Sequence, residues 1–101
     1  MITVKIDGLE YSYSDISASW LNDQIMGRRR GGVPVRIQVL IKSPDVNIAL
    51  STADCAAGGG GRRPYPCERP ILDAWSRIGM DGIDFTAEQL MAFLRQAKSM
   101  I

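Results

Sequence analysis

The feature that most constrains the fold is a ten-residue alternation of side chains, VPVRIQVLIK, at residues 33–42. The odd positions are all valine or isoleucine, and the even positions are Pro34, Arg36, Gln38, Leu40 and Lys42. A period of two is typical of a strand that has one face packed and the other face in water. Pro34 lacks an N–H donor, which places it at the start of the strand or at an edge. The sequence therefore predicts a sheet that is covered on one face only.

Two more alternating runs, ITVKI and LEYSY, flank the dipeptide Asp7-Gly8. This arrangement predicts a hairpin with a type I′ turn, since both central residues of that turn need a positive φ. Later in the chain, Ser43-Pro44-Asp45 predicts a turn, and residues 46–51 predict a returning strand. The inward side chains of these strands are expected to be Ile2, Val4, Ile6, Leu9, Tyr11, Tyr13, Val46, Ile48 and Leu50.

Helical spacing of apolar residues predicts three helices. The first is expected to be capped by Ser14 or Asp15 and to run through about Met26, ended by Gly27 or by the Gly31-Gly32 pair. The second begins near Pro70 and ends at Gly79, and the third begins at a capping box formed by Thr86 and Gln89. The side chains expected on the buried faces are Ile16, Trp20, Leu21, Ile25, Ile71, Leu72, Trp75, Ile78, Leu90, Phe93, Leu94 and Ala97.

The order of elements is ββαββ followed by αα, and at 101 residues the chain has room for one hydrophobic core. We therefore predict a single α+β domain over residues 1–101. It has a four-stranded, mostly antiparallel sheet with helices packed on one face, followed by a C-terminal helical pair. A stretch rich in glycine, arginine and proline, at about 52–68, is expected to be a flexible loop.

Several classes of function are disfavoured by what the sequence lacks. There is no histidine, which removes Ser–His and Cys–His catalytic pairs and histidine metal ligands. No apolar run reaches the length of a transmembrane helix, and the first residues, MITVKID, do not resemble a secretory signal. Two cysteines are too few for a disulfide framework, so a reducing cytoplasm is the expected location. No cofactor and no metal site is predicted.

Positive charge is concentrated in the middle of the chain. Residues 28–69 hold eight of the twelve basic residues and only three of the eleven acidic ones. This segment is where an anionic partner would be attracted. The candidate partner-binding or anion-binding residues are Arg28, Arg29, Arg30, Gly58, Gly59, Gly60, Gly61, Arg62, Arg63 and Tyr65.

The favoured function is non-catalytic binding of a protein or a nucleic acid through this basic segment and the glycine-rich loop. The arginines would supply charge, the glycines close backbone approach, and Tyr65 an aromatic anchor between two prolines. Arginine suits phosphate recognition, but the predicted open face of the sheet carries no aromatic ring on which a base could stack. Protein and nucleic acid therefore both stay open as partners.

Other interpretations of the same segment are weaker. Strand, glycine-rich loop and helix is the order of phosphate-binding loops, but neither G-x-x-x-x-G-K-[ST] nor G-x-G-x-x-G is present. A looser small-anion or phosphate site, and a thiol-dependent enzyme that uses the loop between Cys55 and Cys67, are the alternatives. Arg28 to Arg30 also have a structural interpretation, as cations at a helix carbonyl end. An exposed edge strand would permit a homodimer.

Overall fold

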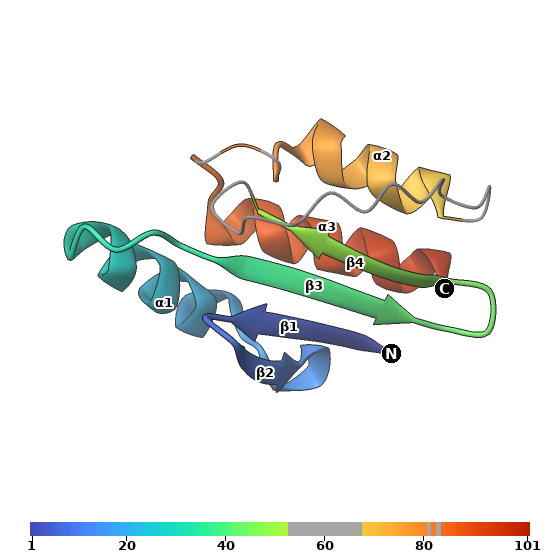
Figure 1. Cartoon of the computed structure of the whole chain (residues 1–101), viewed down its shortest axis with the longest axis horizontal. Coiled ribbons are helices and arrows are strands. Elements are labelled where there is room, and N and C mark those ends of the chain that lie inside the picture. The colour runs from blue at the N-terminus through green and yellow to red at the C-terminus, as the bar shows by residue number, and fades with distance from the viewer. Residues whose placement is uncertain (53–67, 81, 83) are drawn as a thin grey trace.

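The computed structural model describes residues 1–52, 68–80, 82 and 84–101 (Figure 1). The strands β1 (Ile2–Ile6), β2 (Leu9–Ser12), β3 (Ile37–Lys42) and β4 (Asn47–Ser51) form one antiparallel sheet in the order β2-β1-β3-β4. Three α-helices, α1 (Ala18–Arg30), α2 (Arg69–Ile78) and α3 (Ala87–Met100), form the second layer, and a 3₁₀ turn, η1 (Tyr13–Asp15), links β2 to α1. The predicted α+β fold, with its four-stranded antiparallel sheet and C-terminal helical pair, is confirmed.

The core lies between the sheet and the helices. Along β1 and β3 the buried side chains alternate with half-buried or exposed ones, as the sequence pattern predicts. The helix α3 lies in the middle of the helical layer and contacts both α1 and α2 (Figure 1). Its buried face includes Leu90, Phe93 and Leu94, and the ring of Phe93 meets that of Trp75 edge-on, with 5.0 Å between the centroids. Burial of this apolar surface is the main force that holds the two layers together.

The hairpin between β1 and β2 forms as predicted. Asp7 has a φ of 51° and Gly8 a φ of 87°, the two positive values that a type I′ turn requires. Leu9 does not become part of the core, although its register opposite Ile6 puts it on the covered side of the sheet, and it remains 62% exposed. The reason is its place on β2, the strand at the edge of the sheet. The prediction that Leu9 is buried is therefore wrong.

The start of α1 differs from the prediction. The residues expected to cap this helix, Ser14 and Asp15, lie in η1, and the actual cap is Ser17, whose Oγ accepts a hydrogen bond from the backbone N–H of Trp20 at 3.2 Å. Ile16 is buried just before the helix rather than within it. Trp20 is half-buried and packs edge-on against Tyr11, so it borders the core instead of lying inside it.

The end of α1 explains why the next strand starts late. The N–H of Gly32 bonds to the carbonyl of Arg29, and the N–H of Val33 bonds to the carbonyl of Arg28, while Gly32 has a φ of 71°. These two bonds form a Schellman motif. Of the two predicted ends of the helix, Gly27 and the Gly31-Gly32 pair, the structure uses the pair. The motif uses the backbone of Val33 to close the helix, leaves that side chain 50% exposed, and delays β3 until Ile37.

The C-terminal helices follow their sequence signals closely. Gly79 ends α2 in the left-handed conformation, with a φ of 91°. Thr86 caps α3, and its Oγ1 accepts from the N–H of Gln89 at 3.2 Å while the side chain of Gln89 accepts from the N–H of Thr86 at 2.7 Å. Gln89 also donates to the carbonyl of Ile78 at 2.8 Å, which links the start of α3 to the end of α2. Trp75 is buried, as predicted.

Candidate functional site

The arginine run at 28–30 occupies the last turn of α1. Arg28 is held within the fold: its Nε donates to Asp7 Oδ2 at 2.6 Å, and its Nη1 donates to the carbonyl and side-chain oxygens of Gln24 at 3.0 Å. Because Asp7 lies in the β1–β2 turn, this ion pair joins the end of α1 to the sheet. The contact supports a structural role for Arg28.

The other two arginines of the run differ in their surroundings. The guanidinium carbon of Arg29 lies 5.0 Å from the ring centroid of Phe85, a cation–π distance, and Phe85 is itself fully buried. Arg30 is exposed. The three side chains therefore do not form one solvent-directed cluster, and their predicted role in binding stays a prediction.

The sheet presents a second surface on the side away from the core. We call it the open face. It is formed by the strand residues whose side chains alternate with the buried ones, and no helix of the described residues packs on it (Figure 1). Its side chains are Thr3, Lys5, Glu10, Ser12, Gln38, Leu40, Lys42, Asn47, Ala49 and Ser51.

Small or polar residues surround one large apolar side chain on the open face. Leu40 is half-buried on the central strand β3, directly opposite Thr3 on one neighbour and Ala49 on the other. Lys5 lies 3.7 Å from Glu10, so this cation already has a counter-charge. None of the described residues on this face is aromatic, so they do not form the stacking platform of a single-strand RNA binder.

A shallow hollow of about 340 Å³ lies at the β3–β4 side of the sheet. The small side chain of Ala49 stands opposite the larger Leu40, which leaves space beside the leucine. The remaining lining comes from Lys42, Asn47 and Ile48. Leu40 and Ala49 form an apolar floor, and Lys42 adds an ammonium group beside it. Such a surface can bind an apolar side chain of a partner that has a carboxylate next to it. Sequence reasoning did not identify this hollow, and its only sequence signal is a leucine at an even position of the alternating run.

Two buried polar side chains stand at the ends of the segment 53–67. The hydroxyl of Thr52 accepts from the N–H of Ile37 at 3.2 Å and donates to the carbonyl of Val35 at 3.3 Å. Glu68 is only 1% exposed, and its backbone carbonyl accepts the N–H groups of Ile71 and Leu72 at the start of α2. Neither residue was singled out from the sequence. An acid directly before a helix is the signal that identifies Glu68 as a position at a helix start.

The predicted loop falls almost entirely outside the described residues. Its first and last positions, Thr52 and Glu68, are buried and belong to the fold. The candidate residues between them are not placed: Cys55, Gly58, Gly59, Gly60, Gly61, Arg62, Arg63, Tyr65 and Cys67.

The described residues also bear on metal binding and on membrane insertion. Among the residues that the structure describes, no group of three or more histidine, cysteine, aspartate or glutamate side chains is arranged to hold a metal ion. Within the same ranges, none of the helices combines the length and the apolar composition needed to span a bilayer.

Comparison with other proteins adds no identification. No protein-family model, no curated protein and no solved structure matches the chain. The function must therefore be argued from the residues and their arrangement.

Proposed function

We propose that this protein is a non-catalytic binding module that contacts a protein partner through the open face of its sheet. The observation that carries the proposal is the hollow beside Leu40, on a face that no described helix covers. This face includes Lys42 of the basic middle segment, but not the described candidate residues Arg28, Arg29 and Arg30, which lie in α1. A partner that covers the face would remove Leu40 from water and would bring its own charges close to Lys42.

The composition of the open face favours a protein partner over a nucleic acid. Protein interfaces commonly have an apolar centre within a polar rim, and here Leu40 and Ala49 form such a centre. Gln38, Lys42 and Asn47 provide the rim. Nucleic-acid binders instead need several phosphate contacts or stacked bases, and the described residues of the open face include neither an aromatic ring nor a row of arginines.

The test is quantitative capture of partners by three immobilised forms of the protein. The forms are the wild type, the double variant Leu40→Ser/Lys42→Glu, and the control Arg77→Glu, which reverses an exposed charge on α2. We expect a partner that is retained equally by the wild type and the control and about tenfold less by the double variant, as for the loss of an interface hot spot. Thermal unfolding of each form checks that the substitutions leave the fold intact.

Two outcomes contradict the proposal. One is a partner that all three forms retain equally. The other comes from amide NMR spectra recorded with a mixed-sequence oligonucleotide at low and moderate salt. Salt-sensitive shifts confined to the arginine segments, with the open face unchanged, favour a nucleic-acid partner instead.

The glycine-rich loop remains part of the proposal as a second contact element. Arg62, Arg63 and Tyr65 supply charge and an aromatic group to the same partner. The anion-binding and thiol-dependent alternatives rest on the same loop, and a thiol titration distinguishes the latter, because it requires a cysteine with a strongly lowered pKa. Cysteine usage supports a reducing, cytoplasmic location, and the two edge strands, β2 and β4, support a homodimer as an alternative assembly.

A further inference from the structure

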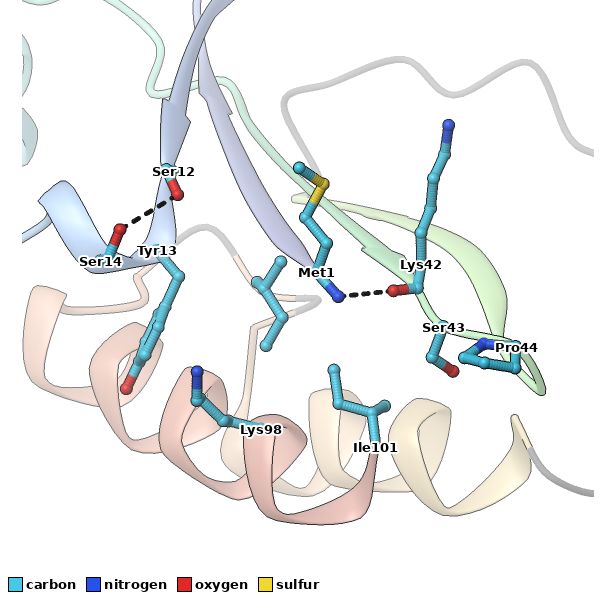
Figure 2. Close-up of a pocket in the computed structure, with 10 residues that line it drawn as sticks. Met1, Ser12, Tyr13, Ser14, Lys42, Ser43, Pro44, Lys98 and Ile101 are labelled. Carbon is cyan, nitrogen blue, oxygen red and sulfur yellow. Dashed lines mark hydrogen bonds between the residues drawn. The ribbon is translucent and has the colours of Figure 1, made fainter.

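A pocket of about 440 Å³ opens at the end of the molecule where β1 begins and α3 ends (Figure 2). It is distinct from the open face, because it lies between the sheet and the helical layer. Its walls come from four separate regions: the start of β1, the passage from β2 into η1, the end of β3 with the turn that follows it, and the C-terminal end of α3. A volume of this size is within the range of sites that hold small molecules.

The chemistry of the walls is rich in hydrogen-bond donors. Ser12 and Ser14 bring two hydroxyl groups to the rim, with their oxygens 3.3 Å apart. The ring of Tyr13 forms one wall, and the ammonium nitrogen of Lys98 lies 5.5 Å from its centroid. The buried side chain of Ile2 adds apolar surface. No aspartate or glutamate side chain is among the residues that line this pocket.

The position of Lys98 gives the pocket its preference for charge. Figure 2 shows its side chain directed toward Tyr13, where a cation–π contact holds the ammonium at the pocket wall. No ion pair of Lys98 is found in the described part of the chain, and the contact of its ammonium is the cation–π contact with Tyr13. An ammonium beside hydroxyl donors, in a pocket whose lining includes no aspartate or glutamate side chain, favours an anion.

We propose that this pocket binds a small organic anion, a carboxylate or a phosphate monoester attached to an apolar body. The anionic group pairs with Lys98 and accepts hydrogen bonds from the serine hydroxyls. The apolar body lies against Ile2 and the ring of Tyr13. This site differs from the proposed protein interface, which is centred on Leu40 and Lys42 of the open face, although Ser12 belongs to both surfaces.

Lys42 provides a matched control for the charge on Lys98. Its backbone lines the pocket, and its carbonyl accepts a hydrogen bond from the nitrogen of Met1. Its side chain extends away from Lys98, toward the open face (Figure 2). Substituting glutamine at either position removes the same charge from the protein, but only Lys98→Gln removes it from the pocket.

The experiment is an amide NMR titration with phenyl phosphate, benzoate and the neutral analogue benzyl alcohol. We expect saturable shifts at Tyr13, Ser14 and Lys98 with at least one of the two anions at millimolar concentration. The two anions distinguish a phosphate from a carboxylate preference. Lys98→Gln should weaken binding about tenfold, the loss of one charge-assisted hydrogen bond. Lys42→Gln should leave the affinity within about twofold.

Three results would overturn the proposal. The first is the absence of saturable shifts with both anions. The second is equal weakening by Lys98→Gln and Lys42→Gln, because general attraction to positive charge needs no pocket. The third is binding of benzyl alcohol as tight as that of benzoate, because the site would then recognise only the ring. Since Lys98 is exposed, its substitution should leave the spectrum of the unliganded protein otherwise unchanged.

Discussion

The two faces of the sheet differ in how deeply the side chains of the same strands are buried. On β3, Ile41 lies against the helices with no exposed surface, whereas its neighbour Leu40 points to the open face and stays half-buried. Both are aliphatic residues of similar size, one position apart. What separates them is the helical layer, which covers one face, whereas no helix of the described residues packs on the other (Figure 1). Under the proposed function, this one strand would serve stability on its covered face and recognition on its open face.

The largest expected effect is a direct test of this contrast. Ile41→Ala should lower the free energy of unfolding by about 2–5 kcal/mol, because it leaves a cavity in the core. Leu40→Ala should lower it by about 1 kcal/mol or less, because the side chain is already partly in water. Urea denaturation of both variants measures the difference. Equal losses would mean that the open face is covered in the free protein, and the proposed interface would then be lost.

A smaller loss of stability is expected at Gly79, the residue that ends α2 before the chain continues to α3. Gly79→Ala should lower stability by about 1–2 kcal/mol, since alanine at a φ of 91° is strained. The added Cβ would also lie 3.3 Å from Nε2 of Gln89, the nitrogen that donates to the carbonyl of Ile78.

The matched control for Gly79 is Gly27→Ala. Gly27 lies within α1, and a Cβ built there meets nothing within 4 Å. Alanine is the better helix former, so this variant should be neutral or slightly stabilising. Thermal unfolding of both proteins tests the prediction, and a Gly79 variant as stable as the wild type would refute the strain argument.

The smallest effect is expected for the ion pair between Asp7 and Arg28. Asp7→Asn keeps a residue that tolerates positive φ but removes the charge. Because both side chains are partly exposed, the loss should be about 1 kcal/mol or less, and it should shrink as salt is added. Denaturation at low and high ionic strength provides the measurement. A loss that is independent of salt would point to packing at the turn rather than to charge.

Much of the fold could be predicted because its signals are local. Alternation identified β1 and β3, the Asp7-Gly8 pair identified the hairpin, and the capping box identified the start of α3. These patterns depend on residues within a few positions of one another. The same applies to Gly79, whose missing side chain is needed for a left-handed helix end.

The mistaken predictions depend on contacts that span the chain or on competition between local signals. Leu9 is exposed because of its place at the edge of the sheet, which its own neighbours do not reveal. Val33 fits the strand alternation, but its N–H is used to close α1. Ser17 caps α1 instead of Ser14, and a sequence with helical spacing follows both serines.

The candidate site was harder to predict than the fold. The contact between Arg28 and Asp7 joins residues 21 positions apart, so the arginine run looked like a free cluster. The hollow beside Leu40 depends on the register that places Ala49 opposite it. The pocket near Lys98 is assembled from the two ends of the described chain. None of these arrangements has a pattern that a single stretch of sequence can reveal.

The hydroxyl of Thr52 has a consequence for how β4 pairs with β3. Sliding a strand by one residue exchanges the side chains of its two faces. In β4 such a slip would carry the threonine hydroxyl away from the N–H of Ile37 and the carbonyl of Val35. Both backbone groups would then lose their partner in the interior. Thr52 therefore helps to fix the register of β4 against β3, and this register keeps Ala49, not a bulkier neighbour, beside Leu40.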